Sequence, residues 1–139
     1  MSTAEQHWAT AAARSGPIEI RLPADADLVS AIRLTASGMA STAKCTLDEI
    51  DDIKLAVSEV LLALIEHGSA RSLTITLQVG DGGFAIVGRG ATQSFDPDHP
   101  DLVLSKTVLA EVCSAHSIDL FDSEMRISAT VQLRRTHAC

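Results

Sequence analysis

The chain is 139 residues long, has a formal net charge of −7 at pH 7, and contains only 3% aromatic residues. This length suffices for one domain, whereas two domains would each fall near the lower limit for a self-sufficient core. An acidic, aromatic-poor chain lacks both the basic surface and the stacking platform that nucleic-acid binding normally needs, so we expect no direct binding to DNA or RNA.

The cysteines and the apolar runs indicate the compartment. Three cysteines, Cys45, Cys113 and Cys139, form no CxxC motif and are odd in number. This argues against a disulfide framework and suits a reducing environment. The longest apolar run, from Val60 to Ile65, is far too short for a membrane span. We therefore expect a cytoplasmic protein without membrane contact.

The first quarter of the chain predicts a tail, a strand and a helix. Residues 1–16 are rich in Ala, Ser and Thr and have no amphipathic period, so we expect a flexible tail before a domain spanning 17–139. Residues 17–22 alternate apolar and polar side chains, as in a half-buried strand. Asp25 or Asp27 can cap the helix that follows.

A long helix is predicted next. Thr46 and Glu49 form a capping box, in which the hydroxyl accepts from the amide three residues on and the carboxylate accepts from the backbone of Thr46. Apolar residues then recur at three- and four-residue spacing as far as Leu64. Gly68 is a suitable C-terminal stop.

The second half of the chain alternates between strand and helix patterns. These predict strand 73–79, a hairpin turn at 81–83, strand 84–87, a polar loop with Gly90, a helix over 102–115, and strands 118–121 and 127–133. The element order is β-α-α-β-β-α-β-β. Hairpin-connected strands favour a mainly antiparallel sheet with helices on one face, a two-layer α/β sandwich.

Two segments carry a resemblance to a known family. Residues 32–41 (IRLTASGMAS) and 46–59, which ends Ala-Val-Ser-Glu, resemble the anti-sigma-factor serine kinases of bacteria, the RsbW and SpoIIAB type of the GHKL ATPase superfamily. The resemblance implies the Bergerat, or histidine-kinase-like ATPase, fold over residues 17–134. It also implies two partners, a sigma factor and an anti-anti-sigma protein of the STAS type, and commonly a homodimer.

The resemblance also assigns site residues. Glu59 occupies the position of the base toward the substrate serine hydroxyl. The Asn that binds Mg²⁺ is replaced by Ala63, which has no oxygen to offer. The Asp that binds adenine in a DxG turn is replaced by Gly88, so Gly90 is the only remnant of that motif.

The glycine-rich phosphate segment is missing as well, because no glycine lies between Asp96 and Cys113. Phosphoryl transfer depends on positioning and charge neutralisation around a metal-bound phosphate, which Glu59 alone does not supply. Residues 61–64 (Leu-Leu-Ala-Leu) instead suggest an apolar plug in the pocket. We therefore expect a degenerate member that binds partners without a cofactor; the alternative is an active serine kinase that uses Mg-ATP.

Arg33 matches the family's arginine contact to the sigma factor. An acidic domain also suits a basic, DNA-binding partner, because opposite charge speeds encounter and narrows partner choice. Two plainer interpretations stay open. Arg33 can extend into solvent from an apolar helix, and the acidic cluster at 48–52 can serve the helix N-terminus rather than a partner.

Further alternatives concern single residues. Glu59 can be an ordinary solvated helix residue, and Arg89 can either fill the former adenine site or point outward. The acidic segment 96–101 suggests either a hard-cation cluster or a turn-rich loop, of which the loop is favoured because no known cation-loop spacing is present. A third functional class is a sensory derivative that dimerises or binds another ligand in the remodelled pocket.

Overall fold

A computed structural model describes residues 16–93 and 96–134. The expected tail over 1–16 falls almost wholly outside these residues and stays a prediction. The described elements are, in order, β1 (Ile18–Pro23), the 3-10 helix η1 (Ala26–Leu28), α2 (Val29–Thr42), α3 (Leu47–His67), β2 (Ser72–Gly80), β3 (Gly83–Ala91), α4 (Pro100–Val112), β4 (Ala115–Phe121) and β5 (Glu124–Val131).

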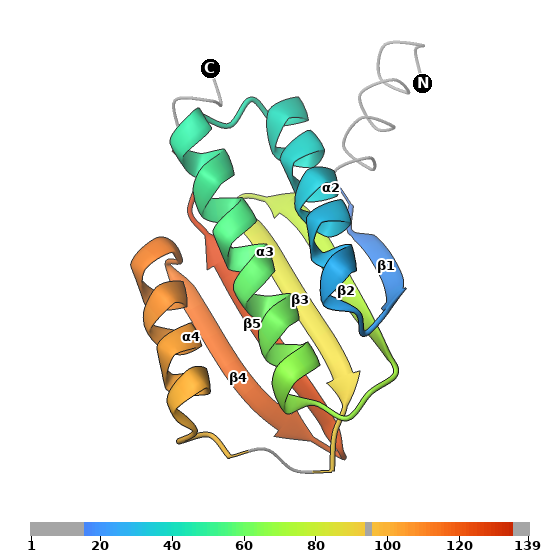
Figure 1. Ribbon diagram of the computed structural model, residues 1–139. Helices are drawn as coiled ribbons and strands as arrows, with labels where there is room; N and C mark the ends of the chain where they lie inside the picture. Colours follow the sequence, from blue (N-terminus) through green and yellow to red (C-terminus); the bar gives the residue numbers. More distant parts are fainter. Residues whose placement is uncertain (1–15, 94–95, 135–139) are drawn as a thin grey trace.

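The five strands form one sheet in the order β1-β2-β3-β5-β4, and every neighbouring pair is antiparallel. Helices α2, α3 and α4 lie on the same face of this sheet (Figure 1). Helix α3 packs on the central strands β3 and β5, with α2 on one side of it and α4 on the other. The predicted two-layer sandwich is confirmed. No helix in the described part of the chain is long and apolar enough to cross a membrane.

The core lies between the sheet and the helices and is aliphatic. Every second residue of the central strands faces the helices, so the alternation in the sequence becomes an apolar sheet face; Leu73, Ile75 and Leu77 of β2 are all buried. Among the described residues, Phe84 is the only aromatic side chain in this core. Each fully buried Leu or Ile contributes roughly 1.5–3 kcal/mol to the free energy of folding.

The predicted capping box at the start of α3 is present. The backbone N–H of Thr46 donates to Oε1 of Glu49 at 2.7 Å, and the N–H of Glu49 donates to the Thr46 hydroxyl at 3.1 Å. The second carboxylate oxygen of Glu49 accepts from the backbone N–H of Arg134 at 2.7 Å. At the other end the N–H of Gly68 donates to the carbonyl of Leu64. Glu49 therefore links the start of α3 to the segment that follows β5.

Two predictions about element boundaries are wrong. Strand β3 does not end at residue 87; it runs on to Ala91, so Gly88 and Gly90 lie within the strand rather than in a turn or loop. The predicted helix over 102–115 begins earlier and ends at Val112, because backbone pairing with β5 draws residues 115–121 into β4. Strand β4 is an almost fully exposed edge strand, which leaves little alternation in its sequence to mark it.

Candidate functional site

Gly88 of β3 lies beneath side chains of helix α3, and Gly90 of the same strand lies beside Leu73 of the neighbouring strand β2. A Cβ atom placed at Gly88 would lie 2.6 Å from Cδ1 of Leu64 and 2.7 Å from Cγ1 of Val60. A Cβ atom at Gly90 would lie 2.7 Å from Cδ2 of Leu73. Such separations are far below a van der Waals contact, so aliphatic groups occupy the space directly above both glycines.

Ala63 of helix α3 also points into the core. It is buried, with 3% of its surface exposed, and its neighbours Leu61 and Leu64 are buried as well. Its methyl group cannot coordinate a cation. Leu62 is only half-buried and lines a different groove, so residues 61–64 do not form one continuous apolar surface. Whether the three buried positions fill a former nucleotide pocket stays a prediction.

Glu59 lies one turn before Ala63 on α3 and is half-buried. Its carboxylate forms no hydrogen bond or ion pair with any other residue of 16–93 or 96–134. Whether it acts as a base or as a solvated helix residue stays a prediction.

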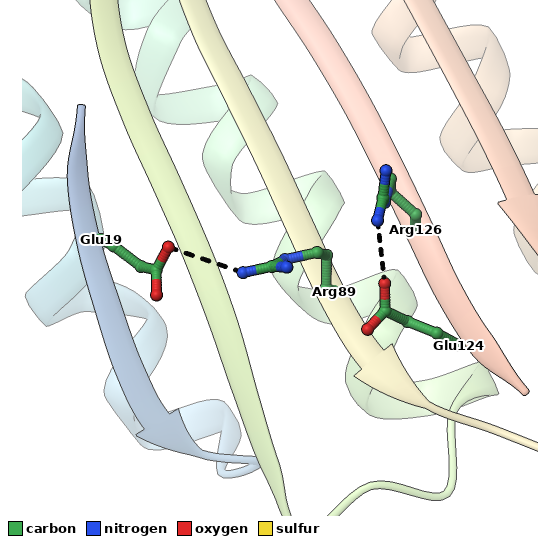
Figure 2. Close-up of polar contacts among 4 residues, drawn as sticks. All are labelled: Glu19, Arg89, Glu124 and Arg126. Atoms are coloured by element: carbon green, nitrogen blue, oxygen red, sulfur yellow. Dashed lines mark hydrogen bonds and ion pairs between the residues drawn. The ribbon is translucent and has the colours of Figure 1, made fainter. Parts of the chain in front are cut away.

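Arg89 points outward, which decides between its two interpretations. Figure 2 shows its side chain reaching across β2 to Glu19 of β1, and the guanidinium lies 3.6 Å from the carboxylate. Beside it, Arg126 of β5 pairs with Glu124 at 3.2 Å and lies over the ring of Phe121. These groups belong to the sheet face opposite the helices, so Arg89 does not fill the space above Gly88.

Arg33 is exposed and lies on a groove between η1 and α2 on one side and α3 on the other. The groove has a volume of about 650 Å³ and is lined by Ala26, Val29, Ser30, Arg33, Asp51, Lys54, Leu55, Ser58 and Leu62. Lys54 and Ser58 were not among the predicted site residues, and Leu62 was assigned to the apolar plug instead. Their four-residue spacing places them in one row along α3 and is the signal that could have found them.

Two cationic side chains, Arg33 and Lys54, line this groove. Neither Arg33 nor Lys54 forms an ion pair within the described ranges. The one acidic side chain in the groove lining is Asp51, which is exposed. The groove therefore carries a net positive charge on a chain whose net charge is −7.

The acidic cluster at the start of α3 has mixed roles. Glu49 is buried and serves the capping box, as described above. Burial, followed by repulsion from Asp48, Asp51 and Glu49, raises the pKa of the Asp52 carboxyl. A raised pKa means that the fold disfavours the ionised form of Asp52. The cluster thus contains one structural carboxylate and one that opposes folding when charged.

The segment before α4 is a turn-rich loop. Oδ1 of Asp96 accepts from the backbone N–H of Asp98 at 2.9 Å, and Nδ1 of His99 caps α4 by accepting from the N–H of Asp101 at 3.2 Å. In the part of the chain that the structure describes, no three His, Cys, Asp or Glu side chains are grouped to hold a metal ion. The side chains of this loop satisfy their own backbone instead.

Comparison with known proteins connects this geometry to a family. Residues 22–113 match the model of the histidine kinase-like ATPase domain. The serine-protein kinase RsbW of Staphylococcus epidermidis is 38% identical over 84 residues, which cover 57% of this chain and 53% of the relative. The protein of the same name from Staphylococcus aureus is 52% identical over 50 residues, 36% of this chain and 31% of the relative. The chain thus spans about half the length, or less, of these curated relatives.

Two solved structures share the fold. The RsbU and RsbW domains of a Mycobacterium tuberculosis protein match with a TM-score of 0.66 at 19% identity, covering 85% of this chain and 32% of that one. A chain of the SiaB–SiaC complex from Pseudomonas aeruginosa matches with a TM-score of 0.56 at 11% identity, covering 94% of this chain and 98% of that one. At these identities the likeness concerns the fold alone.

Proposed function

We propose that this chain, which belongs to the histidine kinase-like ATPase family, regulates transcription by binding proteins and has lost ATP binding and kinase activity. Within that family it belongs to the RsbW and SpoIIAB type of anti-sigma kinases. The packing of Leu64 and Val60 on Gly88 carries this proposal. Gly88 stands where the family has its adenine-binding Asp, and a side chain there would collide with the aliphatic groups above it. The residues present do not fit a bound Mg-ATP.

The remaining positions agree with this proposal. Ala63 offers no oxygen to Mg²⁺, and the chain from Asp96 to Cys113 contains no glycine to let backbone amides approach phosphates. Loss of one carboxylate would weaken a nucleotide site. Loss of the metal ligand, the adenine ligand and the phosphate cradle together removes every group that would position the nucleotide.

The proposed partners are a sigma factor and a STAS-type anti-anti-sigma protein that competes with it. Arg33 supports the first, since it is exposed, forms no ion pair with the residues that the structure describes, and stands at the position of the family's sigma contact. Both partners are proposed to meet the protein in the cytoplasm, where it forms a homodimer as its family commonly does. Without phosphorylation of the antagonist, the relative concentrations of the two partners would determine which of them the protein binds.

An active serine kinase is the second candidate, and Glu59 favours it. The Staphylococcus relatives are serine-protein kinases by name, and Glu59 keeps the position of the base, half-buried on α3. This candidate requires Mg-ATP to bind without its usual ligands. Such binding would need the aliphatic layer above Gly88 to move aside.

Titration calorimetry with Mg-ATP separates the two candidates. We expect no heat of binding at millimolar nucleotide, with the Staphylococcus epidermidis RsbW as positive control. A second measurement follows transfer of labelled phosphate to a STAS-type protein from the same genome, where we expect no label. Micromolar binding, or transfer that disappears in Glu59→Gln, would establish the kinase instead.

The binding function is tested with purified sigma factors from the same genome. We expect one of them to form a stable complex and Arg33→Glu to weaken it at least roughly tenfold, as loss and reversal of an interfacial charge does. A variant at Arg21, an exposed arginine of β1 on the other layer, is the matched control. Absence of a complex with every sigma factor and STAS protein would refute the proposed function.

A further inference from the structure

Strand β4 forms one edge of the sheet, and within the part of the chain that the structure describes it pairs with β5 alone. The pairing runs without a bulge from Ala115, opposite Thr130, to Phe121, opposite Glu124. In an edge strand, alternate residues direct their backbone N–H and C=O groups away from the sheet, where another strand can bind them. The 7 residues of β4 offer about 23 Å of such an edge.

Strand β4 carries few of the features by which proteins protect an edge. Lysine, proline and bulges commonly prevent pairing with a further strand, yet the sequence of β4, Ala-His-Ser-Ile-Asp-Leu-Phe, contains neither Lys nor Pro. Strand β1, at the opposite edge, contains Glu19 and Arg21 and ends in Pro23. The edge at β4 is therefore the one that is open to strand addition.

The helix layer leaves apolar surface uncovered at this edge. Leu120 of β4 lies opposite Met125 of β5, so both side chains point to the helix side of the sheet. Met125 is 0% exposed there, whereas Leu120 is 44% exposed. Helix α4, which lies beside β4 (Figure 1), also exposes Val103 and Leu104. A strand added to β4 would direct every second side chain toward this apolar surface.

The charges around the edge favour a basic partner. Exposed carboxylates lie on α4, on β4 and in the turn after β4; they are Asp101, Glu111, Asp119 and Asp122. The nearby cations already have partners, since Lys106 donates to the carbonyl of Pro97 and Arg126 pairs with Glu124. Asp119 lies opposite Arg126 and shares its sheet face, which is the face away from the helices.

We propose that the outer edge of β4 binds an extended, basic segment of a partner protein by strand addition. Main-chain hydrogen bonds to β4 supply affinity. Apolar side chains at every second position pack beside Leu120 on the α4 side, and a Lys or Arg between them faces Asp119. This surface lies across α3 from Arg33, because α2 is on one side of α3 and α4 on the other (Figure 1). The inference therefore does not rest on the proposed binding of a sigma factor or a STAS protein.

Peptide titration of the ¹⁵N-labelled full chain at low salt tests this surface. The test peptide alternates Val with Lys over about nine residues, enough to span β4. One control peptide has Glu in place of Lys, and another has the composition of the test peptide in an order without alternation. We expect the test peptide to shift the backbone amides of β4 and α4 and to bind at least roughly tenfold more tightly than either control.

Backbone methylation of the test peptide distinguishes strand addition from charge attraction alone. The N–H groups of alternate residues in a strand point to opposite sides. N-methyl groups on one alternate set of residues therefore remove the donors to β4, whereas those on the other set point into solvent. We expect one methylated peptide to lose binding and the other to bind like the unmodified peptide.

Variants of the protein locate the contacts. Asp119→Lys should weaken binding of the test peptide at least roughly tenfold and should shift the preference toward the Glu peptide. Asp81→Lys, with the same charge change in the exposed turn between β2 and β3, is the matched control. Leu120→Thr keeps a strand-forming residue but removes apolar surface, and should weaken binding several-fold. Circular dichroism melts verify that each variant folds.

Several results would overturn the proposal. These are equal binding of the two methylated peptides, equal affinity of the alternating and the reordered peptide, or an equal effect of Asp81→Lys and Asp119→Lys. Shifts of the β4 amides that grow with protein concentration in the absence of peptide would also overturn it, because a second copy would then be the strand that adds. No sigma factor or STAS protein enters these measurements, so this surface and the proposed function can fail independently.

Discussion

Leu64 of α3 lies directly on Gly88 of β3, so close that a Cβ atom at Gly88 would approach Leu64 Cδ1 to 2.6 Å. Both residues are buried. Leu64 therefore fits in its position only because residue 88 is a glycine, and a larger residue at 88 would require a smaller one at 64.

A double-mutant cycle measures that dependence. Gly88→Ala should destabilise the protein by about 1–3 kcal/mol through overpacking, and Leu64→Ala by about 2–5 kcal/mol through loss of core volume. In the double variant the new methyl group enters the space that Leu64 vacates. We expect its destabilisation to fall short of the sum by at least about 1 kcal/mol, measured by urea unfolding.

Gly38 is the matched control for this cycle. It lies on α2 with nothing within 4 Å of its added Cβ atom, so Gly38→Ala should stabilise the protein by about 0.5–1 kcal/mol. Additive effects of Gly88→Ala and Leu64→Ala would show that the two residues do not share one space.

The contacts of Glu49 lead to a second prediction. Glu49→Ala removes the acceptor for the backbone N–H groups of both Thr46 and Arg134, which should cost about 2–3 kcal/mol of unfolding free energy. Thr46→Ala removes only the hydroxyl of the cap and should cost about 1 kcal/mol. Glu66, exposed on the same helix, provides the control. Equal effects of Glu49→Ala and Glu66→Ala would contradict the double anchoring.

The raised pKa of Asp52 predicts a pH-dependent gain from Asp52→Asn. A carboxyl whose pKa is raised in the fold contributes stability below its ordinary value of 3.8, and that contribution is lost as pH rises through the raised pKa. At pH 7 the substitution removes a repelled charge and should stabilise the protein by up to about 0.5 kcal/mol, since solvent screens this group. The gain should vanish as pH falls toward 3.8. Thermal melts of both proteins across this range make the comparison, and a gain that persists there would be inconsistent with the electrostatic cause.

Cys113 should react slowly with alkylating reagents. Burial, followed by the charge of Asp52, raises the pKa of its thiol from 9.0 to about 11, which lowers the thiolate fraction at neutral pH by about 100-fold. In a Cys45→Ser, Cys139→Ser background we expect iodoacetamide to react at least roughly tenfold more slowly than with the urea-unfolded chain. Asp52→Asn should speed the reaction slightly, whereas equal rates in the folded and unfolded chains would show an accessible thiolate.

The local elements of the fold could be predicted because their determinants are close together in the sequence. Thr46 and Glu49 are three residues apart and act within one helical turn, so the start of α3 is readable from the chain alone. Alternation likewise indicated β2. Strand β4 could be predicted only in part, because an exposed edge strand is specified by its pairing with β5 rather than by burial on one face.

What the sequence by itself determined about this protein is its class, an acidic α/β sandwich, and its order of elements. Its resemblance to the family also predicts that Ala63 and Gly88 stand where the family has polar ligands. Tertiary structure alone decided that Gly88 lies within β3 beneath Leu64, that Arg89 points to the opposite face, and that Arg33 and Lys54 line one groove. Spacing along a chain specifies which residues share a helix or strand face. Which faces meet depends on how distant elements pack, and that is decided by the whole core at once.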